Sequence, residues 1–252
     1  MKHTNIIRTA LCAAALVAAG AFTTAHAAPQ RTAFATEANS LPKGMWEFEN
    51  KVSWDHSSGA NAFEFEHELE FGITDKLQAA VLVSWAHEAI SGEPSESAFG
   101  AAGVELFYNL LNPVTDPVGL SFSVETVIGD KEFAVEGRTI LQKNFGPIAL
   151  IYNATLEAVW EGSDYSERVG EFSQNLAVSY DLGGGFYANA ELVHQMEWAD
   201  WDETELNALY VGPSIGYRKG NFWGTIGGGW QVASDKNDAS DFIGSLRVGV
   251  TF

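Results

Sequence analysis

The segment AFEFEHELEFGI at residues 62–73 decides the fold class. Glutamates occupy every second position from Glu64 to Glu70, and the positions between and beyond them are mostly apolar: Phe63, Phe65, Leu69, Phe71 and Ile73. A period of two belongs to a β-strand, whose successive side chains point to opposite faces, and it cannot give an amphipathic helix. The segment therefore predicts a strand with one apolar face and one acidic, water-facing face.

The same alternation recurs along the chain and predicts twelve strands. They are expected at 44–55, 62–73, 77–89, 98–110, 118–129, 132–143, 147–161, 169–180, 186–198, 205–217, 221–233 and 241–252. Five connections are expected to be tight turns, such as 74–76 and 218–220, and six to be generally longer polar loops, such as 55–61. The pattern predicts an all-β fold, a transmembrane up-and-down antiparallel β-barrel of about 12 strands.

Aromatic residues indicate that the apolar face points outward, into a membrane. Trp54, Trp85, Trp160, Trp198 and Trp230 lie at the loop ends of their strands, and Trp46, Tyr108, Tyr180 and Tyr217 lie at the turn ends. Such girdles mark the two interfaces of outer-membrane barrels. A lipocalin-like barrel or a soluble β-sandwich also alternates, but it would have to bury these aromatic rows in a core wider than such barrels fill.

Composition limits the function. The 252 residues include 33 acidic and 14 basic side chains, a formal net charge of −19, which repels the phosphates of nucleic acid. The single cysteine, Cys12, excludes a disulfide framework and a cysteine-based zinc site. We expect no cofactor and no metal site.

The N-terminus indicates export. Lys2 and Arg8 precede an uncharged apolar run, and the small residues around His26 form a cleavage site, which is typical of a secretory signal peptide. We expect residues 1–27 to be removed after Ala27, which leaves 33 acids against 12 bases, a charge of −21. Residues 28–43 are then expected to be a periplasmic N-terminal segment and 44–252 the barrel, in the outer membrane of a Gram-negative bacterium.

Two stretches carry a family resemblance. FEFEHELEFGITDKLQAAVLVSW at 63–85, followed by AFGAAGVELFYNLLNPVTDPVGLSFSVE at 98–125, resembles outer-membrane transporters of the MetA-pathway phenol-degradation family. The matching positions are Glu70, Gly72, Ile73, Thr74, Asp75, Lys76 and Leu77, then Gly100, Gly103, Glu105 and Tyr108. The chain departs from the family at Ile128-Gly129-Asp130, where relatives tend to carry proline. The resemblance covers about a third of the chain and implies a small-solute transporter, without fixing a binding residue.

The inner wall of such a barrel would be acidic. The inward positions hold Glu47, Glu49, Glu64, Glu66, Glu68, Glu70, Glu105, Glu125, Glu136, Glu157, Glu161, Glu171, Glu191 and Glu197, and the inward bases are Lys51, Arg138 and Arg247. Pairing the first two strands sets Lys51 opposite Glu66, Glu49 opposite Glu68 and Glu47 opposite Glu70. Closure of the last strand on the first predicts an ion pair from Arg247 to Glu49 or Glu47.

An acidic, water-filled lumen attracts cations and repels anions. We therefore expect a passive, cation-preferring channel for a small solute, whose protein and lipid partners are the outer-membrane lipid and, through the terminal aromatic Phe252, the barrel-assembly machinery. The alternative is a non-transporting barrel that serves envelope structure or binds a partner. The sequence leaves the solute and the oligomeric state open.

An enzymatic function is not expected. His56 and Ser58 have the His-x-Ser spacing of outer-membrane lipid hydrolases, with Asn61 as the nearest residue that could orient the imidazole. The remaining histidines of the barrel, among them His67, His87 and His194, fall on the outward phase and are too scattered to bind a metal. Strand pairing places Asn50 beside His67, which predicts a hydrogen bond between them.

Overall fold

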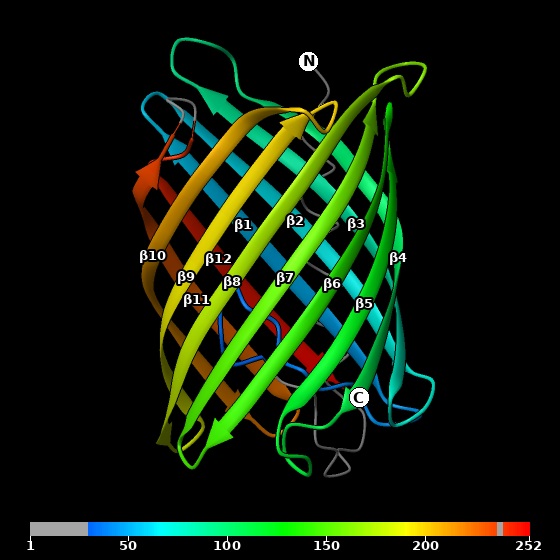
Figure 1. The fold of residues 1–252 in the computed structure, drawn as a ribbon, viewed down its shortest axis with the longest axis vertical. Helices are drawn as coiled ribbons and strands as arrows, with labels where there is room; N and C mark the ends of the chain where they lie inside the picture. The colour runs from blue at the N-terminus through cyan, green and yellow to red at the C-terminus, as the bar shows by residue number, and fades with distance from the viewer. Residues whose placement is uncertain (1–29, 236–238) are drawn as a thin grey trace, which may run out of the picture.

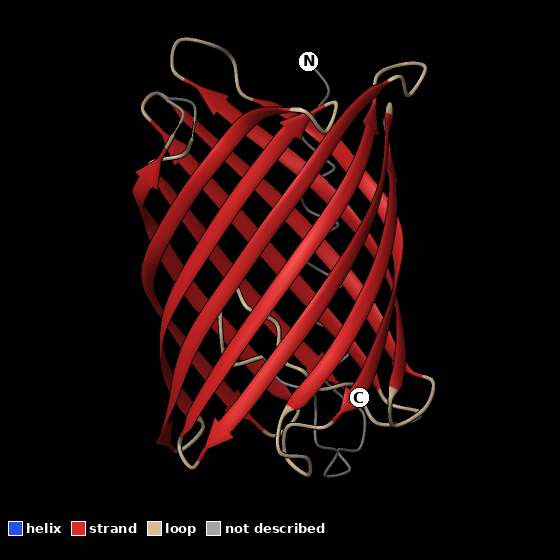
Figure 2. Ribbon diagram, viewed as in Figure 1, coloured by secondary structure: helices blue, strands red, loops and turns tan. Residues whose placement is uncertain are grey.

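The computed structural model describes residues 30–235 and 239–252, which form a closed barrel of twelve antiparallel strands (Figure 1). The strands are β1 (Trp46–Ser57), β2 (Ala60–Gly72), β3 (Leu77–Ile90), β4 (Glu96–Leu111), β5 (Gly119–Gly129), β6 (Glu132–Phe145), β7 (Ile148–Glu161), β8 (Glu167–Gly183), β9 (Phe186–Ala199), β10 (Glu203–Lys219), β11 (Phe222–Ser234) and β12 (Phe242–Thr251). Strands and loops make up the described chain (Figure 2). The described residues contain no helix that is long and apolar enough to cross a membrane.

Each strand pairs with the next along the chain, and β12 closes on β1. The twelve predicted strands all exist, and every predicted boundary lies within three residues of the observed one. Closure leaves no unpaired sheet edge, so the backbone hydrogen-bonding groups of the wall are satisfied between strands. This is the condition under which β-structure can lie in lipid. The predicted fold class is therefore confirmed.

The expected contrast between short turns and long loops is only partly right. The loop expected at 55–61 is a two-residue turn, because β1 and β2 stay paired out to Ser57 and Ala60 and Gly59 adopts a φ of 97°. Glycine reaches this left-handed region without steric cost. At the opposite end, the β4–β5 connection spans residues 112–118 and is one of the longer ones.

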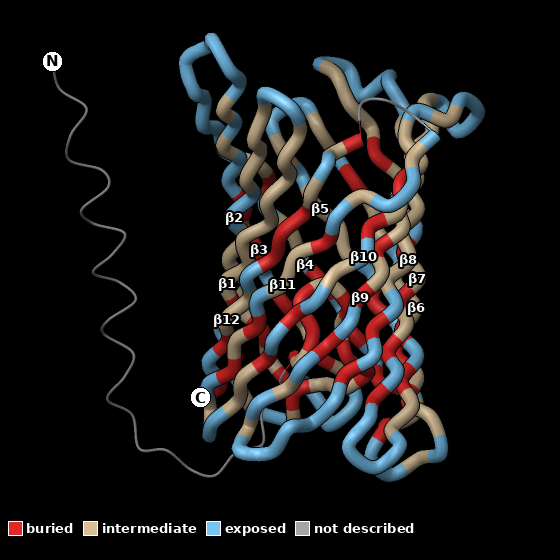
Figure 3. The backbone as a smooth tube through the Cα atoms, turned by 90° about the vertical axis from the view of Figure 1, so that its left-hand side faces the viewer, coloured by how far each residue is buried: buried red, intermediate tan, exposed pale blue. Residues whose placement is uncertain are grey.

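The outer face of the wall is apolar and the inner face is largely polar, as the alternation predicts. Val81 and Ile226 on the outer face are 54% and 60% exposed, whereas Glu47 on the inner face is 1% exposed. Buried and exposed stretches accordingly alternate along the strands (Figure 3). Near the loop end, outer aromatic rings meet across strands: Trp54 lies against Phe63 and Phe242, and Trp160 against Phe133.

Residues 30–43 lie inside the barrel, in the half that contains the turns and the C-terminus (Figure 1). We call this stretch the N-terminal plug. Ala33, Ala35, Ala38 and Leu41 are at most 2% exposed, although none of them belongs to a strand. From the sequence we expected a periplasmic segment that precedes the barrel, and this packing was not predicted. The predicted signal peptide, residues 1–27, lies outside the described residues.

Candidate channel lumen

One carboxylate of the wall holds the centre of the plug. Glu191 on β9 accepts hydrogen bonds from the backbone N–H groups of Ala33, Phe34 and Ala35, at 2.7, 3.0 and 3.2 Å. The Ser214 hydroxyl on β10 donates to the same carboxylate. Three consecutive backbone donors around one buried anion form a strong, charge-assisted arrangement. Glu191, expected to contribute to ion selectivity, therefore has a structural partner.

Side-chain amides from the surrounding strands bind the rest of the plug backbone. Asn153 on β7 binds both sides of Thr36, accepting from its N–H at 2.6 Å and donating to its carbonyl at 2.9 Å. The Gln142 oxygen accepts from Ala38, and the Gln78 oxygen accepts from Leu41. The remaining donors to plug carbonyls are Asn109 to Ala38, Asn175 to Phe34, Asn189 to Arg31 and the hydroxyl of Ser245 to Ala33.

Small apolar side chains seal the plug against the wall. Ala35 packs in a fully buried cluster with Ala149, Ile151 and Ala177, which point inward from β7 and β8. Ala38 packs in another with Phe107 and Ile140. Apolar residues on the inner face of a water-filled barrel would be costly, and the plug removes them from water.

A change in the inward-facing residues along the strands could have revealed the plug. The inward set is dominated by glutamate toward the loop ends, but toward the turn ends it contains Gln78, Asn109, Gln142, Asn153 and Asn189. An amide carries both a donor and an acceptor, so it can pair with the N–H and C=O groups of an extended backbone. A ring of inward amides thus indicates a peptide segment within the barrel.

Above the plug, toward the loops, the lumen widens into a cavity of ≈560 Å³. We call it the acidic chamber. Its floor includes Gln30, Thr36 and Asn39 of the plug, and its wall carries nine glutamates: Glu64, Glu66, Glu68, Glu70, Glu105, Glu125, Glu132, Glu136 and Glu157. Lys51, Arg138 and Arg247 are the bases among its lining residues. Arg138 pairs with Glu136 at 2.7 Å and Lys51 with Glu66 at 3.5 Å.

The structure separates the predicted acidic residues into groups. Eight of them line the chamber. Glu191 binds the plug, and Glu47 and Glu49 are buried near the turn end. Glu171 lies opposite Glu157 and Glu197 in the pairing of β8 with its two neighbouring strands. Glu132 was missed, although it shares the phase of Glu136 on β6 and lines the chamber. Counting inward positions out to the strand end would have found it.

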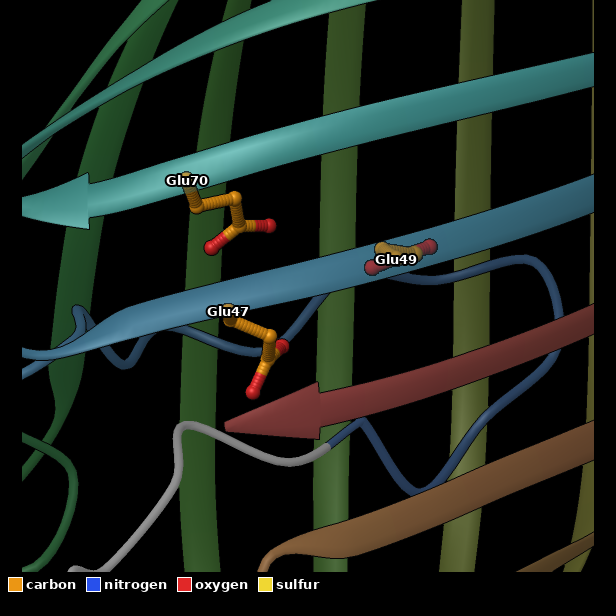
Figure 4. Close-up of side chains that lie close together, drawn as sticks. All are labelled: Glu47, Glu49 and Glu70. Carbon is orange, nitrogen blue, oxygen red and sulfur yellow. The ribbon is translucent and has the colours of Figure 1, made fainter. Parts of the chain in front are cut away.

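Three buried carboxylates converge where β12 closes on β1 (Figure 4). One carboxylate oxygen from each of Glu47 and Glu49 on β1 and Glu70 on β2 lies within 4.8 Å of the other two. Glu47 accepts from the indole N–H of Trp223 at 3.0 Å and the hydroxyl of Thr251 at 2.7 Å, and Glu70 accepts from the Gln78 amide at 2.5 Å. We call this group the seam cluster.

The expected ion pair across the seam is present. The Arg247 Nε lies 2.6 Å from one Glu49 oxygen, and its Nη2 lies 3.2 Å from the other. The strand register sets Arg247 directly opposite Lys51, not opposite the glutamates. Because these like charges repel, each side chain turns to an acid: Arg247 to Glu49 and Lys51 to Glu66.

The histidine near Ser58 pairs with an amide. His56 Nδ1 lies 3.0 Å from the Asn61 Oδ1, which also accepts from the Trp54 indole. Ser58 lies beyond the end of β1, exposed, and within the described residues no hydrogen bond joins it to His56. The predicted bond between His67 and Asn50 is confirmed, with 2.5 Å between Nδ1 and Oδ1.

The plug contains one acid, Glu37, whose protonation should depend on whether the plug is packed inside the barrel (seated) or has left it (released). Burial raises the pKa of Glu37 to about 6, although Arg31, 2.8 Å away, opposes the shift. A raised pKa means that the seated plug binds a proton more tightly than the released plug does. Seating is therefore most favourable below the ordinary pKa of 4.5, and about 2 kcal/mol of this advantage is lost as the pH rises through 6.

We expect the plug to become more accessible between pH 4.5 and pH 6.5. Cys12 is the only cysteine of the full chain, so in a protein that lacks residues 1–27, Ala35→Cys at a fully buried plug position gives a unique reporter whose labelling by a thiol reagent can be timed. Adding Glu37→Gln should abolish the rise attributed to Glu37, and comparing the two proteins at each pH cancels the pH dependence of the thiol itself. Identical profiles with and without this substitution would contradict the prediction.

Comparisons with known proteins agree with this architecture. An outer membrane channel of the COG4313 group from Pseudomonas putida F1 has a similar structure, with a TM-score of 0.68 at 14% identity over 85% of this chain and 98% of that one. The NanC porin matches with a TM-score of 0.54 at 12% identity, over 82% and 98%. The β domain of the Bordetella autotransporter BrkA matches with a TM-score of 0.55 at 8% identity, over 84% and 100%. At these identities the likeness shows the fold alone.

Sequence comparison places the chain in a family without a known activity. No curated protein matches it. The phenol-degradation family that the sequence resembles is not the one whose model matches. The matching model describes DUF6662, a family of unknown function, and covers residues 24–245. Because this match spans most of the chain, the protein belongs to the DUF6662 family.

Proposed function

We propose that this protein is a passive, cation-preferring outer-membrane channel for small solutes, with a lumen that the N-terminal plug narrows at the turn end. The observation that carries the proposal is the imbalance of charge in the acidic chamber, where nine glutamates face three bases within ≈560 Å³. Rings of carboxylates in a pore bounded by a low-dielectric wall concentrate cations and exclude anions. The porin and channel described above support the choice of transport over catalysis by their fold.

The orientation follows the usual rule for such barrels. The six connections from β1–β2 to β11–β12 at the loop end face outward. The five connections at the other end, together with the plug, face the periplasm. The signal peptide directs export and is cleaved after Ala27, and the C-terminal strand ending at Phe252 is presented to the assembly machinery. The solute is small and carries positive charge.

Reversal potentials in planar bilayers test the selectivity. Under a salt gradient, we expect the wild-type barrel to favour potassium over chloride by about tenfold, because the chamber wall is acidic. Replacing Glu64, Glu66 and Glu136 by glutamine removes three chamber charges without touching the residues that bind the plug, and should move the ratio toward one. An anion preference in the wild type would contradict the proposal.

A matched control removes the same number of charges elsewhere. Glu93→Gln, Glu96→Gln and Asp202→Asn change three exposed acids at the loop end, outside the chamber lining. This variant should keep the wild-type permeability ratio apart from a small surface effect that high salt suppresses. If both triple variants changed selectivity equally, the chamber would not be the selective element.

One observation favours the alternative of a non-transporting barrel: the plug fills the lumen on the turn side. The same bilayer measurement separates the two functions. A channel conducts ions once the plug has been removed, if not before. A purely structural barrel, whose lumen is blocked elsewhere, shows no conductance with or without the plug.

A further inference from the structure

A row of hydrogen-bonded polar side chains crosses the membrane-facing wall. It runs over four neighbouring strands, β7 to β10, and ends at the residue that follows β11. It consists of Tyr152, Gln174, His194, Asn207 and Asp235, which we call the outer row. The Tyr152 hydroxyl lies 2.6 Å from Gln174 Oε1, and Gln174 Nε2 lies 3.2 Å from His194 Nδ1. His194 Nε2 lies 3.0 Å from Asn207 Oδ1, and Asn207 Nδ2 lies 2.7 Å from Asp235 Oδ2.

The row lies on the lipid side of the barrel and runs from the depth of the hydrocarbon, at Tyr152 and His194, to the loop end of the wall, at Asp235. The next residues in sequence, Asn153 and Asn175, reach inward to the plug, so Tyr152 and Gln174 point outward. His194 is four residues from Trp198, an aromatic of the loop-end girdle, which places it about 10 Å below the girdle for a strand of ordinary tilt. Polar groups at this depth are expensive unless they are satisfied.

The hydrogen bonds of the row all run in one direction. Tyr152 donates to the Gln174 oxygen, the Gln174 amide donates to His194, and His194 donates to Asn207, whose amide donates to the Asp235 carboxylate. This order requires a neutral His194 that carries its proton on Nε2. Asp235 is therefore the one charged group of the row, and each amide nitrogen keeps a second hydrogen to donate.

A groove of ≈480 Å³ opens along the row. Leu176, Leu192 and Leu209 line it together with all five side chains of the row. Near its loop end, the pairing of β10 with β11 shifts, from Tyr210 opposite Gln231 to Leu209 opposite Ala233. Such bulges often lie beside binding sites, where they redirect side chains. An aliphatic wall beside a polar strip is the surface that an amphiphile requires.

The charge around the groove selects the headgroup. Asp235 is the only charged residue in the lining, and exposed Asp200, Asp202, Glu203 and Glu205 surround the same end of the barrel. From residue 186 to 235 the sequence has only two bases, Arg218 and Lys219, which lie at the opposite end of β10. Residues 236–238, which lie outside the described residues, add one base and one acid, Lys236 and Asp238, and leave the net charge of this end acidic. This rim repels a purely anionic headgroup and attracts an ammonium group.

We propose that the groove binds a membrane lipid with an amine headgroup. The lipid's ammonium pairs with Asp235, its carbonyl oxygens accept the free amide hydrogens of Asn207 and Gln174, and an acyl chain lies along the three leucines. The row then serves two roles, since it satisfies its own polar groups in lipid and holds Asp235 and the amides in place for the ligand. This site is separate from the lumen and does not depend on transport.

Native mass spectrometry of the full-length mature barrel in detergent tests the proposal. The protein is offered equal amounts of phosphatidylethanolamine and phosphatidylglycerol with identical acyl chains. We expect the wild type to retain the amine lipid over the anionic one by about fivefold, the effect of one partly exposed ion pair. Asp235→Asn should bring the ratio close to one, and Leu192→Asn should lower the retention of both lipids.

Asp181→Asn is the matched control, because it removes an exposed carboxylate at the turn end of the same sheet and should leave the ratio unchanged. Heat-modifiable migration in gels verifies that each variant is folded. Equal retention of the two lipids by the wild type, or an unchanged ratio in Asp235→Asn, would overturn the proposal. A dimer that dissociates on His194→Leu would also overturn it, since a second copy would then cover the row.

Discussion

Deleting residues 30–41 should raise the single-channel conductance severalfold and leave the barrel intact. The plug fills the turn half of the lumen, where its alanines are fully buried against inward-facing residues of the wall. The conductance of a pore is set by its narrowest part, so removing the plug exposes the wider chamber to the turn side. The strands pair only with one another, and the wall therefore does not need the plug to close.

Planar-bilayer recordings of the deletion variant measure this effect. A point variant that weakens the binding of the plug without removing it gives a second test. Glu191→Ala removes the acceptor of three plug N–H groups and should give a channel that fluctuates between the occluded and the open level. Glu197→Ala on the same strand and face is the control, because no plug residue bonds to it, and it should behave as the wild type. Equal conductance of the deletion variant and the wild type would show that the plug does not limit conduction.

Replacing Arg247 by leucine should destabilise the barrel by about 3–5 kcal/mol, the cost of leaving a buried carboxylate without its partner. Arg247 and Glu49 are 11% and 4% exposed, and Glu47 and Glu70 lie beside them, so the uncompensated charge has like charges for neighbours. Equilibrium unfolding in urea of barrels folded into lipid vesicles, followed by tryptophan fluorescence, measures the loss.

Two further variants show whether charge is the cause. The double variant Arg247→Leu, Glu49→Leu removes both members of the pair and should recover most of the lost stability. Lys51→Met breaks the neighbouring pair, whose members are 36% and 19% exposed, and should cost less than about 1 kcal/mol because water screens it. A similar loss in Arg247→Leu and Lys51→Met would contradict the role assigned to the seam cluster.

The wall was predictable because its signals are local and repeated. Alternation along 62–73 assigns Glu66 and Glu68 to one face, and the hairpin that follows β1 then fixes Lys51 opposite Glu66 and Asn50 opposite His67. A shift of one residue in the register would have placed all four glutamates of this strand in lipid. The hydrophobic pattern therefore specifies the pairing strongly. The length of the turn at Ser58-Gly59 was overestimated because its flanking residues are polar. Polar residues do not prevent two strands from pairing beyond the membrane.

The plug was not predictable from its own sequence, which has neither strand nor helix periodicity. Its position depends on backbone groups, which every residue carries, and on side chains such as Glu191 and Asn153 that lie over a hundred residues away. Ion selectivity was the natural hypothesis for an inward glutamate. Only the fold shows that the Glu191 carboxylate accepts hydrogen bonds from the backbone of Ala33, Phe34 and Ala35. The outer row was also hidden, because His194 looked isolated until neighbouring strands supplied Gln174 and Asn207.

The plug also bears on how the barrel acquires its size. Residues 31–41 are hydrogen-bonded to seven of the twelve strands, β3, β4, β6, β7, β8, β9 and β12, through side chains such as Gln78, Asn153 and Ser245. A ring with one strand more or fewer would move these partners out of reach of so short a peptide. The contacts of the segment that precedes the wall thus fit a barrel of this circumference, and they favour twelve strands over eleven or thirteen although the wall closes without them.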